Sequence, residues 1–157
     1  MSPVAPPTTV RTAHALWMTA VAAGVFETVL SISRMTGDGS AADGIGAGLA
    51  FRLAVFTAVV LTALRMRAGA RWARLALALG LGILGTASLV VEPLGYLLDG
   101  GSIASAAERA DAGAWIFAAS RAVHVAAVLT AVFLMFRPAS NAWFRERGRA
   151  LSRSAAT

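Results

Sequence analysis

Five ionisable residues interrupt the apolar stretches of this 157-residue chain, and their types could do chemistry. They are Glu27, Arg52, Glu92, Arg121 and His124. Carboxylates and an imidazole can relay protons, and carboxylates together with guanidinium groups can bind a charged or amphipathic small molecule. Because an unpaired charge in apolar surroundings is costly, each group requires either a partner of opposite charge or a polar cavity.

The segments that carry these residues have the composition of a membrane protein. Of the chain, 57% is hydrophobic and 14% is charged, and the mean hydropathy is +0.68. Apolar stretches near the ~20 residues that cross a bilayer as a helix cover residues 13–33, 49–66, 72–98 and 114–136. They lack the polar and apolar alternation of barrel strands. The sequence therefore predicts an all-α membrane fold, a four-transmembrane-helix bundle within residues 11–137.

The basic residues, all of them Arg, indicate how these helices cross the membrane. Ten fall before the first stretch, between the second and third, or after the fourth: Arg11, Arg65, Arg67, Arg71, Arg74, Arg137, Arg145, Arg147, Arg149 and Arg153. The other two loops hold only Arg34 and Arg109, together with five acidic residues. By the positive-inside rule both termini are cytoplasmic, an N-in/C-in topology in the cell membrane. The net charge of +6 then reflects topology and contact with the lipid bilayer, and no nucleic acid is expected as a partner.

Two tails flank the predicted bundle. Residues 1–10 contain three Pro residues, which predicts a disordered cytoplasmic tail. Residues 138–157 form a basic cytoplasmic tail, in which residues 141–147 mix aromatic side chains with Arg. This pattern fits a short interfacial helix or a solvated basic tail, and the sequence leaves both open.

The loop between the second and third stretches has a pattern of its own. Residues 69–74 read Gly-Ala-Arg-Trp-Ala-Arg. This Gly-x-x-Trp-Ala-Arg segment resembles a cytoplasmic loop of small, uncharacterised multi-pass membrane proteins of actinobacteria. The resemblance is confined to this loop. It implies a location in a bacterial plasma membrane and carries no implication about activity.

With this topology, the five ionisable residues fall in the outer half of the membrane. A rise of ~1.5 Å per residue places them roughly 5–15 Å below the outer boundary. Glu27 and Glu92 each belong to a stripe of small, weakly polar residues at helical spacing, which predicts contact with other helices. The stripes comprise Ala20, Gly24, Glu27, Thr28 and Ser31 in the first helix and Gly85, Ser88, Glu92 and Gly95 in the third. Arg121 and His124 also share one helical face.

The two halves of the chain carry intramembrane charges in the same order. In each half an acid precedes an Arg, Glu27 before Arg52 and Glu92 before Arg121. This order leads to the hypothesis of a parallel two-helix repeat. Such a repeat would have a pseudo-twofold axis along the membrane normal and a site at the interface between the halves.

Two functions fit the cluster. A small transport or ligand-binding module would use the five residues to line a cavity for a small-molecule ligand or a proton. The alternative is a non-catalytic accessory or scaffold membrane subunit whose Glu–Arg pairs brace the helices. Its partner would be a second copy of the chain, as a homo-oligomer, or another membrane protein.

Catalysis, metals and cofactors have weaker support in the sequence. An intramembrane enzyme is the third interpretation, because neither Ser88 nor Ser120 has an assigned base. Haem ligation is disfavoured, since His14 and His124 lie at opposite depths. A metal held by two Glu and a His would compete with the adjacent Arg side chains, so no metal and no cofactor are expected.

Overall fold

The computed structural model describes residues 5–37 and 45–154, and this part of the chain forms helices and no strand. The elements are α1 (Thr8–Gly37), α2 (Ile45–Arg67), α3 (Arg71–Leu77), η1 (Ala78–Gly85), α4 (Thr86–Leu98), α5 (Ile103–Arg109), α6 (Ala112–Met135) and α7 (Pro138–Ser154). Four helices are long and apolar enough to cross a membrane: Thr8–Met35, Gly46–Arg67, Arg71–Leu98 and Ala112–Met135. The prediction of an all-α fold with four long apolar helices is therefore confirmed.

Two helices begin earlier than the sequence predicts. Helix α1 starts at Thr8 rather than at residue 13, and the Pro7 carbonyl accepts hydrogen bonds from the N–H groups of Val10 and Arg11. Val10 is buried, so residues 8–10 belong to the packed helix and not to a disordered tail. Helix α2 starts at Ile45 rather than at residue 49. Residues 1–4 of the predicted tail and residues 38–44, between the first two predicted helices, lie outside the described residues.

A short helix, α5, occupies the connection between α4 and α6. Ser102 caps it, because its hydroxyl oxygen accepts a hydrogen bond from the Ser105 N–H at 3.1 Å. The Tyr96 hydroxyl, at the end of α4, accepts a hydrogen bond from Arg109 Nη2 at 3.0 Å. These bonds hold α5 against the end of α4.

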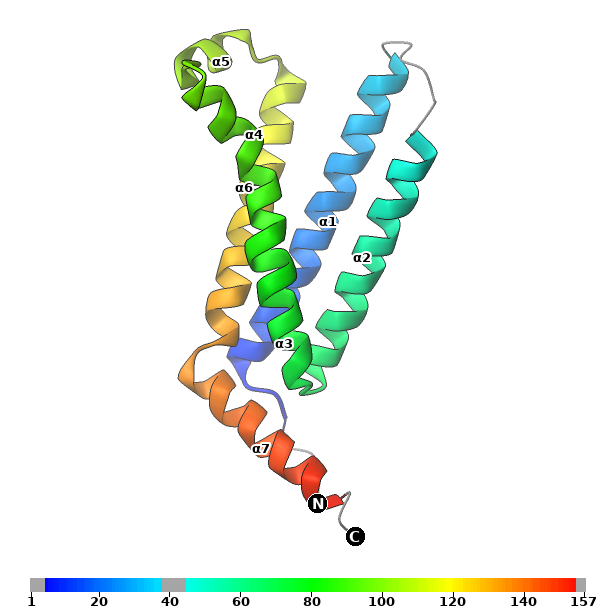
Figure 1. Ribbon diagram of the computed structural model, residues 1–157, viewed down its shortest axis with the longest axis vertical. Coiled ribbons are helices and arrows are strands. Elements are labelled where there is room, and N and C mark those ends of the chain that lie inside the picture. The colour runs from blue at the N-terminus through cyan, green and yellow to red at the C-terminus, as the bar shows by residue number, and fades with distance from the viewer. Residues whose placement is uncertain (1–4, 38–44, 155–157) are drawn as a thin grey trace.

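The long helices pack side by side and separate towards one end of the molecule. Figure 1 shows α1 and α2 leaning away from α4 and α6 towards the end that carries α5, here called the α5 end; the opposite end, where α7 lies, is the α7 end. The most extensive helix contact joins α1 and α6. The largest fully buried side chains, Trp17, Phe144, Met66, Leu77 and Met135, all lie in the half of the molecule near the α7 end. Helix α4 has no buried residue, so the hydrophobic core lies near the α7 end and α4 takes no part in it.

The turn between α2 and α3 explains the residue types of the Gly-x-x-Trp-Ala-Arg segment. Gly69 has φ 99°, a left-handed conformation that favours Gly, and a Cβ there would lie 3.2 Å from the side chain of Arg147. Ala73 is buried, whereas Trp72 is exposed. Arg74 donates hydrogen bonds to Asn141 Oδ1 at 2.6 Å and to the Met135 carbonyl at 3.3 Å. The segment therefore joins the second and third long helices and binds the start of α7.

Helix α7 is anchored to the α7 end by both polar and aromatic contacts. The Ser140 hydroxyl donates to the Leu134 carbonyl at 2.8 Å and lies 2.8 Å from the Thr9 hydroxyl of α1. The guanidinium of Arg74 lies over the ring of Phe144, 4.9 Å from its centroid. Trp143 and Phe144 are both buried in the protein. Residues 138–154 thus form a helix whose aromatic side chains pack against the rest of the protein.

The elements α3, η1 and α4 run on as one long helix, Arg71–Leu98, which is the third long helix of the fold. Its middle part, η1, is a wider π-helical turn. In η1 the Thr86 N–H bonds to the Leu81 carbonyl, a π-type bond spanning one residue more than in an α-helix, and the Thr86 hydroxyl donates to the same carbonyl at 3.3 Å. Gly82 permits close packing here, because a Cβ at this position would lie 2.9 Å from Val132 Cγ2 of α6. Gly80 faces open space, with no atom within 4 Å of the corresponding position. The widened turn therefore packs closely against α6 at Gly82 and faces open space at Gly80.

Candidate functional site

Glu27 is buried between α1 and α6. Its side chain is 6% exposed, and its Oε1 lies 3.4 Å from His124 Nδ1. The Ser120 hydroxyl donates to the same oxygen at 3.5 Å. Ser120 and His124 are one helical turn apart on α6, so both side chains reach the same point on α1. The structure therefore places the His124 imidazole beside the Glu27 carboxylate, although His124 Nδ1 makes no hydrogen bond among the described residues.

Small residues of α1 make this approach possible. The predicted stripe on α1 does face other helices, since Ala20, Gly24, Glu27 and Thr28 are all buried. A Cβ on Gly24 would lie 2.9 Å from Phe56 Cε1 and 3.4 Å from His124 Cε1. Gly24 therefore lets rings from α2 and α6 contact the α1 backbone directly.

The two Arg residues of the predicted cluster lie beside this pair and bind other groups. Arg52 Nη1 of α2 donates to Thr28 Oγ1 at 3.2 Å. Arg121 Nη1 lies 3.9 Å from Glu92 Oε2, and its guanidinium lies over the Phe117 ring at 4.9 Å. Within the part of the chain that the structure describes, no Arg nitrogen lies within 4.0 Å of the Glu27 carboxylate.

The predicted stripe on the third helix does not make the expected helix contacts. The Glu92 side chain is 87% exposed, Ser88 is exposed, and nothing lies within 4 Å of a Cβ built on Gly95. The reason is the separation of the helices at the α5 end, which leaves α4 without a buried residue. Glu92 is therefore bound only loosely by Arg121, whereas Glu27 is enclosed.

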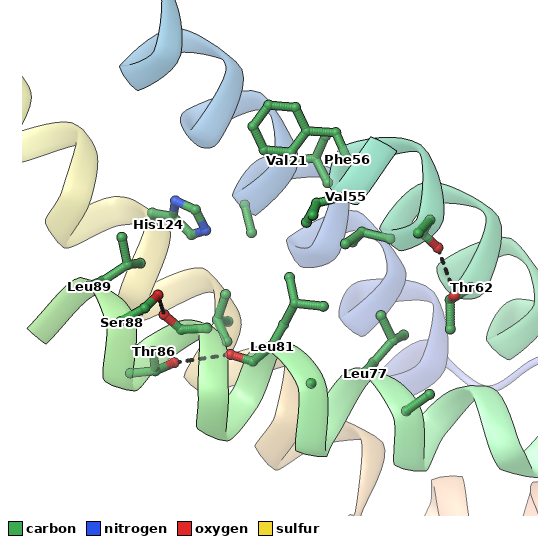
Figure 2. A pocket seen from close by; sticks show the side chains of 17 residues that line it. Val21, Val55, Phe56, Thr62, Leu77, Leu81, Thr86, Ser88, Leu89 and His124 are labelled. Atoms are coloured by element: carbon green, nitrogen blue, oxygen red, sulfur yellow. Dashed lines mark hydrogen bonds between the residues drawn. The ribbon is translucent and has the colours of Figure 1, made fainter. Parts of the chain in front are cut away.

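An apolar cavity of about 420 Å³ lies between the long helices, next to His124. Its wall includes Val21, Val55, Phe56, Leu77, Leu81 and Leu89. Figure 2 shows His124 at the end of the cavity nearest Ser88 and Leu89, with Leu77 and Thr62 towards the other end. Pro93 has no backbone N–H, so it cannot donate the usual helical hydrogen bond to the carbonyl of Leu89 at this end of the cavity. The cavity is thus apolar along its length and polar at one end.

The sequence did not predict this cavity. Three residues of the widened turn, Gly80, Leu81 and Gly85, line it, together with the buried Leu77 and Val128. The three Gly residues at positions 80, 82 and 85 could have indicated a cavity here, because Gly in the interior of a helix often marks a close approach or an open space.

Ser120 lies near an acid but not in the arrangement of a nucleophilic triad. In such a triad the imidazole lies between the hydroxyl and the carboxylate and accepts the hydroxyl proton. Here Glu27 contacts both the Ser120 hydroxyl and His124 Nδ1, and no hydrogen bond joins Ser120 to His124 among the described residues. The geometry is that of a carboxylate beside an imidazole, without the chain of hydrogen bonds that a triad requires.

Over residues 5–37 and 45–154, the chain is helical, has four helices long and apolar enough for a membrane, and holds a buried carboxylate beside an imidazole at an apolar cavity. No protein-family model, no curated protein and no solved structure matches the chain.

Proposed function

We propose that this protein is a membrane-embedded module that binds a small amphipathic molecule, for transport or for presentation to a partner. The observation that carries the proposal is the cavity of about 420 Å³, apolar along its wall and bounded at one end by His124. Ligand sites in proteins typically have volumes of roughly 300–1,000 Å³ and few polar groups. The apolar body of the ligand would occupy the wall, and its polar end would face the imidazole.

The Glu27–His124 pair would recognise the polar end. The Glu27 carboxylate lies 3.4 Å from His124 Nδ1, so a ligand hydroxyl or carbonyl would bind the other ring nitrogen, Nε2. The side chain of His124 is 14% exposed, so a bond to it would form away from bulk water. Arg52, Glu92 and Arg121 would then serve as flanking charges rather than as direct ligands.

A substitution at Gly80 tests this proposal. Gly80→Leu adds a branched side chain at the cavity wall, at a position where nothing lies within 4 Å of the Cβ. Binding of a pyrene-labelled long-chain alcohol should weaken by about tenfold or more, because the probe and the new side chain compete for the same space. The measurement is energy transfer from Trp to pyrene in detergent micelles.

Gly95→Leu is the matched control for Gly80→Leu. Gly95 lies on the same long helix and also faces open space, but it does not line the cavity. Probe binding should stay at the level of the unmodified protein. Equal binding by the Gly80→Leu and Gly95→Leu variants would contradict the assignment of the cavity as the binding site.

The proposed orientation places the α7 end in the cytoplasm of a bacterial cell. It rests on the concentration of Arg around the α2–α3 turn and in α7. The chain contains no Cys, so Ala106→Cys in α5 and Ala139→Cys in α7, both at exposed positions, each create a single label site. An impermeant maleimide should label residue 106 in intact cells and residue 139 only after permeabilisation. The reverse pattern would overturn the orientation.

The second candidate function is a non-catalytic accessory or scaffold subunit, and one observation favours it. Helix α4 has no buried residue, although it carries the charged Glu92 in a segment apolar enough for a membrane. An exposed carboxylate in lipid is costly, so a partner helix would cover this face in such an assembly. Retention of the alcohol probe by the Gly80→Leu variant would favour this alternative.

A further inference from the structure

A second hollow lies at the α7 end, on the side of α1 that faces away from the core. Its volume is about 450 Å³. It is lined by Thr8, Arg11, Thr12, His14, Ala15 and Arg67. The first five come from the first two turns of α1, and Arg67 is the last residue of α2. The antiparallel packing of α1 and α2 brings these two helix ends together.

The hollow has an excess of positive charge and unused hydrogen-bond donors. Among the described residues, no carboxylate lies within 4.0 Å of Arg11 or Arg67, and neither guanidinium donates a hydrogen bond to another group of the chain. His14 Nδ1 is buried and has no hydrogen-bond partner in the same part of the structure. The Thr8 and Thr12 side chains add two hydroxyls to the wall.

These groups match the chemistry of a phosphate. Guanidinium groups bind phosphate oxygens with two parallel hydrogen bonds, and hydroxyls can satisfy the remaining oxygens. The start of α1 adds the positive end of a helix dipole to the two Arg side chains. The hollow is separate from the apolar cavity and shares no residue with it.

We propose that this hollow is a phosphate-binding site, which takes the phosphate of an anionic phospholipid or a free phosphate. In the proposed orientation it lies at the cytoplasmic surface, where anionic lipid headgroups are abundant. The site does not depend on the proposed ligand of the apolar cavity, because the two bind different chemistry at different places.

The test uses the full chain in detergent and compares two double variants of equal charge. Arg11→Gln with Arg67→Gln removes both guanidinium groups of the hollow. Arg145→Gln with Arg149→Gln removes two exposed charges from α7, at the same end of the molecule but outside the hollow. Binding of phosphatidylglycerol, followed by native mass spectrometry against phosphatidylcholine, should weaken by about tenfold or more in the first variant only. Both variants should keep the melting temperature of the unmodified protein without added lipid.

Competition with inorganic phosphate distinguishes the two sources of the phosphate. Displacement of phosphatidylglycerol by millimolar inorganic phosphate identifies a site for the phosphate group itself. Selective loss in the Arg11 and Arg67 variant, without such displacement, identifies a lipid site. Equal loss in both double variants would show only diffuse attraction to the basic surface and would overturn the proposal, as would unchanged binding in both.

Discussion

Replacing His124 with Leu should lower the free energy of unfolding by about 3–5 kcal/mol, because it leaves a buried carboxylate without its main partner. The side chain of Glu27 is 6% exposed, and its remaining neighbour would be the Ser120 hydroxyl at 3.5 Å. That single bond is at the long limit for a hydrogen bond and cannot replace an imidazole. The measurement is unfolding in mixed micelles, followed by the helical circular dichroism signal.

A double-mutant cycle shows whether the two side chains stabilise each other. The His124→Leu, Glu27→Leu double variant should be more stable than His124→Leu alone, because it removes the stranded carboxylate. Ser120→Ala should cost only about 1 kcal/mol, since it removes one weak bond. If the effects of the two Leu substitutions simply add, Glu27 and His124 are not coupled and the pair has no special role.

Glu27→Gln separates a structural role of the pair from a role in ligand binding. The amide keeps the shape of the side chain, removes its charge and retains an oxygen that can accept a hydrogen bond. Stability close to that of the unmodified protein, combined with weaker binding of the alcohol probe, would support the proposed recognition of the polar end. Loss of stability without any change in probe binding would instead support bracing.

Replacing Trp17 with Ala should lower the free energy of unfolding by about 3–5 kcal/mol. Trp17 is fully buried near the α7 end, and its indole N–H donates to Met135 Sδ at 3.5 Å. The substitution leaves a cavity where α1 meets α6, the most extensive helix contact in the molecule. Thermal unfolding should show a lower midpoint, and α7 should become more accessible to proteases.

Trp72→Ala is the control for the loss of an indole ring as such. Trp72 is 59% exposed in the chain, so its removal should change the unfolding free energy by about 0.5 kcal/mol or less. A comparable loss at both positions would mean that the packing at the α7 end does not account for the stability of the fold.

Hydrophobic pattern was sufficient to predict the four long helices, but not the short helix α5 or the widened turn η1. Four apolar stretches became four long helices, because in lipid every backbone polar group must be satisfied inside its own segment. The stripe through Gly24 and Glu27 was also correct, since small residues at helical spacing mark a face that other helices approach closely. The similar stripe through Glu92 was wrong, because the helices separate at its level.

The sequence by itself determined the number and approximate length of the long helices, and which residues of each helix share a face. These properties depend on composition and on a period of 3.6 residues along one helix. The tertiary structure alone decided that Glu27 meets His124 rather than Arg52 or Arg121. A rotation of one helix by a single residue, about 100°, exchanges one partner for another without changing the pattern. Gly24, Gly82 and the widened turn of the third helix set those rotations and distances. Gly80, Leu81 and Gly85 of the widened turn line the cavity, which exists only between helices and therefore has no counterpart in any one segment.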